Sequence, residues 1–316
     1  MARAEKKSRR MATERPPTID PVAAARWQRV APPRSPWLHE EVGRRMEDRL
    51  QWIKLKPSAW ADWEPVRGGV KAHALVEARY READCFIATT RADVARTAIK
   101  AVARPWWRRL GAPKPRLGAL PDGEARMLWA NMALHLSADP QALIAQWQRA
   151  LAVDGFLMFS CLGPDSLREL RKVYLAMGWP PPAHEFTDMH DWGDMLVGAG
   201  FAEPVMDMER ITLTWDSPLK LLAELAELGS NLHSQRFAAL RGRRWRAELE
   251  EALLAQLGGV DGRLALTFEI IYGHALKAAP RVRVSGESAV SLADMRVLLQ
   301  AQNTPRGPGA GSPGRG

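Results

Sequence analysis

Short apolar runs alternate with amphipathic segments through the middle of this chain. The runs "ADCFIATT", "ARMLWANMAL" and "GFLMFSCLG" are almost continuously apolar, which is typical of strands buried on both faces of a parallel sheet. The segments between them, such as "RADVARTAIKAVA" and "DPQALIAQWQRAL", have the pattern of helices. This alternation predicts an α/β fold, a doubly wound, Rossmann-like sheet of parallel strands with helices on both faces.

Several segments carry helix signals at their ends. Apolar residues in the segment 39–55 recur at helical spacing. Asp139, followed by Pro140, has the residue types preferred at a helix N-cap and first helical position. Either Thr187 or Asp188 is expected to cap the helix in "TDMHDWGDMLVGAGF".

Two helical segments, "SPLKLLAELAELG" and "RWRAELEEALLAQLG", lie between the last two strand-like runs, "PVMDMERITLTW" and "RLALTFEIIYGHAL". This order predicts a small helical lid beside the sheet, at about residues 216–258.

The chain is expected to hold one folded α/β domain, residues 35–285, between a basic, Pro-rich disordered arm (1–34) and a disordered tail (302–316). The formal net charge is +9, of which residues 1–15 carry +4 and the residues from 302 onward carry +2. About +3 is left for the folded part. A net positive charge this small on the folded part argues against a nucleic-acid-binding surface.

The two cysteines, Cys85 and Cys161, each lie inside an apolar run, as expected of buried free thiols in a cytoplasmic protein. The seven histidines show no metal-ligand spacing, so no metal site is expected. No run of about 18 uncharged apolar residues is present to cross a membrane. A cytoplasmic protein without a metal is therefore predicted.

Several stretches stand together in the order and spacing of a known family. They include "HEEVGRRMEDRLQWIKLKP", "WANMALHLSADPQALIAQWQRALAVDGFLMFSCLGPDSLRELR", "HEFTDMHDWGDMLVGAGF", "LAELGSNLH" and "GRLALTFEIIYGHA", and they cover roughly residues 35–280. Together they resemble the malonyl-acyl-carrier-protein O-methyltransferases, class I S-adenosylmethionine-dependent enzymes that begin biotin synthesis. The resemblance implies S-adenosylmethionine as cofactor and methyl ester formation on a malonyl thioester.

The chain departs from that family at the expected cofactor loop, "DWEPVRGGVKAH". The family's first strand ends on an acidic residue and a GxGxG turn, because glycines let the backbone approach the ligand closely. Asp62 stands for the acidic residue, but Glu64 and Val66 occupy glycine positions, and only Gly68 and Gly69 remain. Side chains there restrict positive φ, and the intervening proline removes a donor. We therefore expect this loop to follow a different path.

The end of the second strand also departs from the family. An acidic residue there normally accepts hydrogen bonds from both ribose hydroxyls, and Thr89 or Thr90 falls at the matching place. A neutral hydroxyl cannot accept both bonds as a carboxylate does. Asp93, one helical turn further on, is the alternative if the register is shifted.

The exit of the fourth strand, "WANMALHL", matches the family. By resemblance, Asn131 and His135 are candidate catalytic residues that position the reacting groups. The alternative is that Asn131 caps the strand exit and His135 lies in a pocket wall. The candidate cofactor-binding residues are Asp62, Gly68, Gly69, Thr89 and Asn131.

The malonyl carboxylate requires a cationic partner, and Arg168 and Arg171 are the candidates because their helix lies at the same end of the sheet as the expected pocket. An acyl carrier protein is strongly acidic, so it is expected to dock on "RPWWRR" (104–109) or "RGRRWR" (241–246). Solvated arginines beside partly buried tryptophans are the simpler interpretation of both patches.

Three functions thus remain open. The first is a divergent methyltransferase of the malonyl-acyl-carrier-protein type. The second is a pseudo-methyltransferase that lacks the cofactor and serves as a protein-binding module, since the fold does not fix the function. The third is nucleic-acid binding through the basic arm and the Arg/Trp patches, which the small charge of the folded part disfavours.

Overall fold

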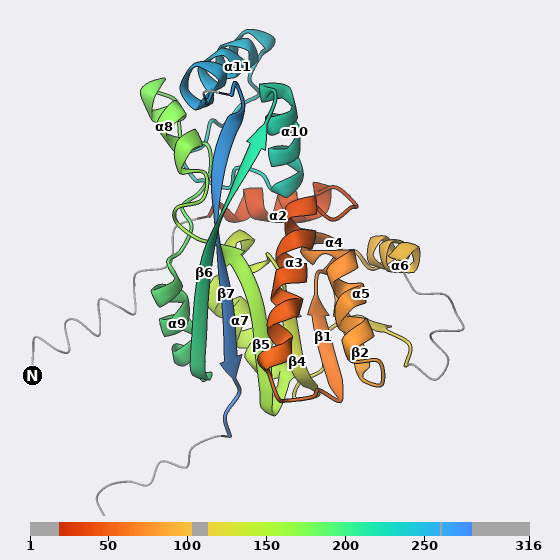
Figure 1. The fold of residues 1–316 in the computed structure, drawn as a ribbon. Helices are drawn as coiled ribbons and strands as arrows, with labels where there is room; N and C mark the ends of the chain where they lie inside the picture. Colours follow the sequence, from red (N-terminus) through yellow and green to blue (C-terminus); the bar gives the residue numbers. More distant parts are fainter. Residues whose placement is uncertain (1–18, 103–112, 260, 280–316) are drawn as a thin grey trace, which may run out of the picture. The chain divides into compact units, whose positions relative to one another are not determined.

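The computed structural model describes residues 19–102, 113–259 and 261–279 (Figure 1). All of them belong to a unit that ends at Ala279. The expected disordered tail, 302–316, and the patch 104–109 lie outside the described residues.

Seven strands form one sheet in the order β3-β2-β1-β4-β5-β7-β6. Strands β1 to β5 pair in parallel wherever they are neighbours, as the continuous apolar runs predict. The strands are β1 (Ala59–Trp63), β2 (Asp84–Ala88), β3 (Arg116–Leu117), β4 (Ala125–Ala130), β5 (Leu151–Leu162), β6 (Ala202–Trp215) and β7 (Leu264–Leu276). The Rossmann-like fold class is confirmed.

One strand departs from the parallel arrangement, because β7 runs antiparallel to both β5 and β6. The reason lies in the lid, formed by α10 (Pro218–Leu228) and α11 (Arg243–Leu257). Trp215 at the end of β6 pairs with Leu264 at the start of β7. Since the lid returns the chain to the sheet end that it left, β7 must run back in the opposite direction (Figure 1). These helices occupy the segment in which a lid was expected.

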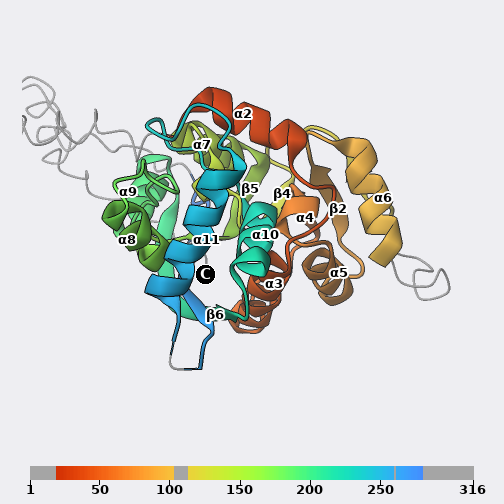
Figure 2. The same ribbon diagram turned by 90° about the horizontal axis from the view of Figure 1, so that it is seen from above.

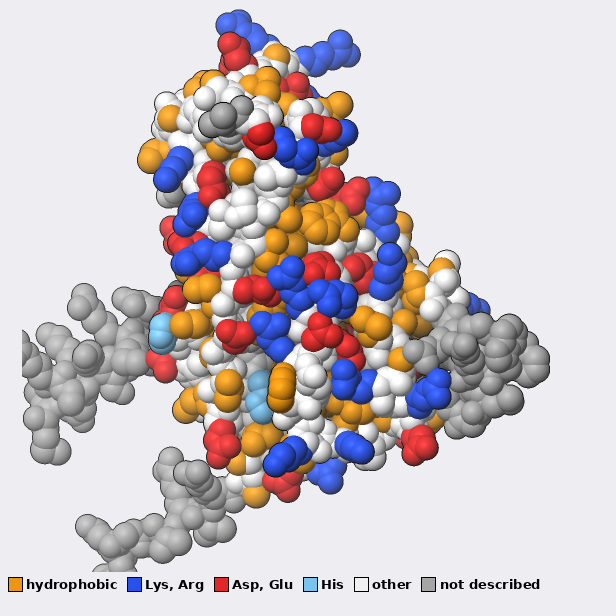
Figure 3. Space-filling model, in the orientation of Figure 1, with side chains coloured by type: hydrophobic (Ala, Val, Ile, Leu, Met, Phe, Trp, Pro, Cys, Tyr) orange, Lys and Arg blue, Asp and Glu red, His pale blue; other side chains and the backbone are white. Residues whose placement is uncertain are grey.

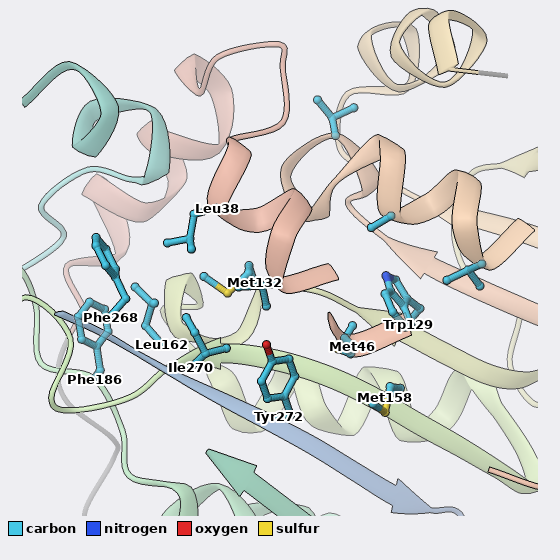
Figure 4. Close-up of a cluster of buried hydrophobic side chains, with 14 of the residues drawn as sticks. Leu38, Met46, Trp129, Met132, Met158, Leu162, Phe186, Phe268, Ile270 and Tyr272 are labelled. Atoms are coloured by element: carbon cyan, nitrogen blue, oxygen red, sulfur yellow. The ribbon is translucent and has the colours of Figure 1, made fainter. Parts of the chain in front are cut away.

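Helices cover both faces of the sheet (Figure 2). On one face, α3 (Trp37–Arg49), α5 (Val70–Arg79) and α6 (Ala92–Val102) contribute to the larger core cluster, together with α8 (Arg168–Ala176) and the lid. On the other face, α7 (Pro140–Ala150) and α9 (Met189–Gly198) pack on a second cluster. Figure 4 shows Met46 of α3 beside Trp129 and Met158, which come from neighbouring strands of the sheet. The apolar periodicity of the sequence thus reports real burial.

Side-chain caps fix the starts of two predicted helices. Asp139 Oδ1 accepts a hydrogen bond from the Ala142 N–H at 2.9 Å, as predicted. Of the two candidates at α9, Asp188 is the cap, because its Oδ1 accepts from the His190 N–H at 2.8 Å.

The expected disorder of residues 1–34 is wrong for the part that the structure describes. Helix α2 (Pro21–Val30) begins at Asp20, whose side chain accepts from two backbone N–H groups of the first turn. Arg236 also donates to Asp20 at 2.6 Å. Asp20 followed by Pro21 is a recognisable N-cap signal. The surrounding Pro-rich composition nevertheless favoured a prediction of disorder, because the helix depends on tertiary contacts that the sequence does not show.

Candidate functional site

A cavity of about 420 Å³ opens at the carboxyl ends of β1, β2 and β4. In a doubly wound sheet, ligands bind where the strand order reverses, which is between β1 and β4 here. We call it the edge cavity. Its walls include residues at or just after the ends of these three strands, among them Trp63, Glu64, Thr89, Thr90, Met132 and Ala133.

The segment after β1 forms a short helix, α4 (Pro65–Gly68), in place of a glycine-rich turn. Glu64 adopts a left-handed conformation with φ 52°, and Pro65 takes the first helical position, where its missing N–H costs nothing. Gly69 has φ 118°, and a Cβ on it would lie 2.8 Å from a carboxylate oxygen of Glu40. The segment after β1 is therefore helical, and Gly69 is in close contact with its surroundings.

Helix α4 packs directly on the exit of β4. The side-chain amide of Asn131 donates to the backbone carbonyls of Gly68 and, at 2.7 Å, of His39, and its oxygen accepts from Ser160 Oγ at 2.5 Å. A Cβ on Gly68 would lie 3.1 Å from the Asn131 carbonyl. Asn131 therefore ties α3, α4 and β5 together in a buried network.

Asp62 at the end of β1 is paired inside the protein rather than at the cavity. His73 Nδ1 lies 2.7 Å from Asp62 Oδ2, and both side chains are almost fully buried. Burial raises the pKa of Asp62, and the hydrogen bond from His73 opposes that shift. Of the five candidate cofactor-binding residues, Thr89 lines the edge cavity, whereas Asp62, Gly68, Gly69 and Asn131 do not.

Thr89 meets a partner that sequence reasoning missed. Its hydroxyl donates to Glu64 Oε2 at 2.9 Å, and the Thr90 N–H donates to Glu64 Oε1 at 2.7 Å. The alternative, Asp93, has a side chain that is 96% exposed and pairs with Arg96. The carboxylate at the end of β2 is thus that of Glu64, which comes from the end of β1.

Arg67 is a second residue that the sequence did not single out. Its guanidinium lines the edge cavity, lies over the Trp27 ring at 5.2 Å, and donates to the carbonyls of Glu227 and Leu228 at the end of α10. Its Nε is buried without a partner, and burial lowers its pKa to about 10. Glu64 is close enough to act on the charge of Arg67 but makes no hydrogen bond or ion pair with its guanidinium, and a buried cation in that state suits an anionic group of a ligand.

A second cavity of about 220 Å³ lies under the lid and is called the lid cavity. Met132 and Leu136 line both cavities and so form part of the wall between them. Apolar side chains dominate the lid cavity, including Leu162, Phe186 and Phe268, which Figure 4 places near Met132.

Three histidines, His39, His135 and His184, also line the lid cavity. Burial lowers the pKa of His39 to about 3 and of His184 to about 4, and holds that of His135 well below its ordinary value. His184 Nε2 donates to the His135 carbonyl at 2.8 Å, while the Nδ1 atoms of both residues are buried without partners. These neutral imidazoles leave hydrogen-bonding capacity free beside the cavity.

Neither candidate for binding the carboxylate lines the lid cavity. Arg168 pairs with Glu169 and lies 3.9 Å from Asp165 on the surface. Arg171 is closer, because it donates to the His184 carbonyl at 3.3 Å and its guanidinium lies 5.3 Å from the centre of the Phe186 ring.

The patch 241–246 combines aromatic packing with surface charge. The Arg241 guanidinium lies 4.1 Å from the centre of the Trp245 ring and 4.3 Å from that of Phe237. Arg244 and Arg246 pair with glutamates one turn further along α11. On the face shown in Figure 3, basic and acidic side chains are interspersed rather than separated.

Within the ranges that the structure describes, His, Cys, Asp and Glu side chains form no group of three or more that would hold a metal ion. The same ranges contain no helix long and apolar enough to span a membrane.

The fold resembles that of known methyltransferase-type structures. The YcgJ protein of Bacillus subtilis superposes with a TM-score of 0.51 at 11% identity, over 75% of this chain and 99% of that one. A candidate methyltransferase from Bacillus halodurans superposes with a TM-score of 0.50 at 14% identity, over 74% of this chain and 99% of that one. These likenesses show that the chain has the Rossmann-like α/β fold of these structures.

Sequence comparison identifies the family. The malonyl-[acyl-carrier protein] O-methyltransferase of Laribacter hongkongensis is 38% identical over 276 residues, covering 83% of this chain and 88% of that protein. The enzyme of the same name from Gallionella capsiferriformans is 36% identical over 269 residues, covering 80% and 88%. No family model matches the chain. By its relatives, the chain belongs to the malonyl-[acyl-carrier protein] O-methyltransferase family.

Proposed function

We propose that this protein transfers a methyl group from S-adenosylmethionine to the free carboxylate of a malonyl thioester carried by an acyl carrier protein, as a cytoplasmic enzyme. The observation that carries the proposal is the pair of adjoining cavities, which share Met132 and Leu136. The edge cavity would take the nucleoside cofactor, and the lid cavity would take the acyl group. The relatives' names supply the substrate.

The edge cavity lies where the sequence predicts the cofactor, but one of the residues that would hold the cofactor there was not predicted. Its volume of about 420 Å³ falls in the range of small-molecule sites. Trp63 offers an apolar wall, and Thr89 a polar group. The approach to the glycine backbone is closed by Asn131. Arg67 instead would hold the carboxylate of the methionine part, since its Nε is free.

Bound S-adenosylmethionine supplies an electrophilic methyl group, and the malonyl carboxylate is already ionised near neutral pH. The chain therefore needs no general base. Its residues gain rate by aligning the two reactants and by excluding water from between them. The apolar lining of the lid cavity serves the second purpose.

The lid cavity would take the malonyl end of the substrate. His135 and His184 present the unpartnered Nδ1 atoms to orient it, so His135 acts as a positioning residue. Arg171 contributes positive charge behind His184. Arg168 is the weaker candidate for binding the malonyl carboxylate, because it lies on the surface among carboxylates that already pair with it.

The acidic carrier protein is proposed to dock at 241–246, where Arg243 begins helix α11 of the lid and Arg241 lies just before it. Arg241 stacks on Trp245, which keeps its charge at a defined place. Steering of this kind weakens as salt rises. The association rate of Arg241→Ala with malonyl-acyl-carrier protein should therefore fall, and its dependence on salt should become shallower.

The test is mass spectrometry of malonyl-acyl-carrier protein after incubation with the chain and S-adenosylmethionine. One added methyl ester per acyl group is expected. His135→Asn should raise KM by about tenfold, the effect of one lost polar contact, whereas the matched change at the exposed His190 should leave it unchanged. An unmodified malonyl group at high enzyme concentration would refute the proposed activity.

A further inference from the structure

Two departures from the family's cofactor motif meet in the structure. A glutamate replaces a glycine after β1, and a threonine replaces the acidic residue after β2, 25 residues later. The hydroxyl of Thr89 donates to the carboxylate of Glu64. We propose that Glu64 is the carboxylate that accepts hydrogen bonds from the ribose diol of the cofactor, supplied by β1 instead of β2. This inference rests on the proposed use of S-adenosylmethionine.

The position of the Glu64 carboxylate supports this role. Two donors from the end of β2 hold it, the Thr89 hydroxyl at 2.9 Å and the Thr90 N–H at 2.7 Å. Glu64 also lines the edge cavity. A carboxylate has about four lone-pair sites, so two remain for the two hydroxyls of a ribose. Among the described residues, no Lys, Arg or His side chain forms an ion pair with Glu64 that would occupy them.

The backbone holds Glu64 in this place. Its N–H donates to the carbonyl of Ala88, the last residue of β2, at 2.7 Å. Its own carbonyl accepts from the N–H groups of Arg67 and Gly68 at 2.9 and 2.8 Å, which closes helix α4. A left-handed conformation in a residue other than glycine is strained and persists where the surroundings enforce it, often at ligand sites. The side chain is therefore positioned before any ligand arrives.

The arrangement also explains why the end of β2 carries a threonine. Two carboxylates at hydrogen-bond distance would repel each other, and one would have to take up a proton. A hydroxyl at position 89 donates to Glu64 instead. The two departures from the motif thus compensate each other, which neither shows when it is considered alone.

The experiment is isothermal titration of the full chain with S-adenosylhomocysteine and with its 2′-deoxy analogue. The wild-type chain should bind S-adenosylhomocysteine at least about tenfold more tightly than the 2′-deoxy analogue, because the analogue lacks one charge-assisted hydrogen bond. Glu64→Gln should lose about tenfold or more in affinity for the ribose form and should no longer distinguish the two ligands. Glu82→Gln is the matched control, because Glu82 is exposed just before β2, and it should behave as wild type.

A comparison of the two ligands on the wild-type chain needs no variant, so it stands even if Glu64→Gln unfolds. Equal affinity of the wild-type chain for both ligands, or unchanged discrimination in Glu64→Gln, would overturn the role of Glu64 while leaving cofactor binding intact. Absence of binding of either ligand to the wild-type chain would overturn both this inference and the proposed function.

Discussion

Asn131 holds α4 against the sheet, and replacing it with alanine measures how much that contact contributes. The substitution leaves the buried carbonyls of Gly68 and His39 without their side-chain donor and removes the acceptor of Ser160. A buried carbonyl left without any donor costs about 1–3 kcal/mol, and this cost falls on Gly68, because the His39 carbonyl lies inside helix α3 and keeps its helical partner. The lost bond to His39 adds about 0.5–1.5 kcal/mol, so the free energy of unfolding should fall by about 1.5–4.5 kcal/mol, a large share of the total stability of a domain.

The assay is urea denaturation followed by tryptophan fluorescence. The same substitution at Asn231 is the control, because its side chain makes two comparable bonds, to Pro181 and His233, in a half-buried place that water can reach. Asn231→Ala should cost about 1 kcal/mol or less. If Asn131→Ala costs no more than Asn231→Ala, the reasoning that the Asn131 network fixes α4 on β4 is wrong.

Three further predictions follow from burial. The imidazoles of His39 and His184 have pKa values of about 3 and about 4 in the folded protein and about 6.5 in the unfolded chain. The unfolded state therefore binds more protons than the folded state in acid. The free energy of unfolding should have its full value above pH 6.5 and should fall towards pH 4, by up to about 1.4 kcal/mol per pH unit for each histidine. In His39→Asn this fall should be less steep. Burial raises the pKa of Cys85 and Cys161, so a thiol reagent should label neither in the native protein and both in denaturant; rapid native labelling would contradict their burial. Arg67→Ala removes two hydrogen bonds to the end of α10, so hydrogen exchange of the α10 amides should become faster while that of the β4 amides stays slow. Equal exchange of the α10 amides in the wild type and the variant would show that Arg67 does not hold the lid.

Local patterns were sufficient to predict the central part of the fold. Apolar runs marked the strands because a central parallel strand is buried on both faces, and Asp139 was readable as a cap because its hydrogen bond lies within one helical turn. The direction of β7 was not predicted, since it depends on the lid returning the chain to the sheet end at which β6 stops. Helix α2 was also missed, because contacts such as that between Asp20 and Arg236 join residues far apart in the chain.

The site was predicted less completely for the same reason. The sequence showed that Glu64 disrupts the glycine pattern and that Thr89 cannot replace a carboxylate. It could not show that these side chains touch, since a contact between two loops depends on the path of both. The pairing of Asp62 with His73 was hidden in a similar way. A signal was present, however, in the joint appearance of an unexpected acid and a missing acid at the two strand ends.

The most direct test of cofactor binding is a titration of the wild-type chain with S-adenosylmethionine, at protein concentrations that detect dissociation constants up to about 1 mM, or roughly −4 kcal/mol. We expect binding in the micromolar range, because the edge cavity offers the Glu64 carboxylate, the Arg67 guanidinium and an apolar wall at Trp63. Absence of heat over that range, together with an unchanged melting temperature, would contradict this expectation, because the segment after β1 would then close the cofactor site rather than rebuild it.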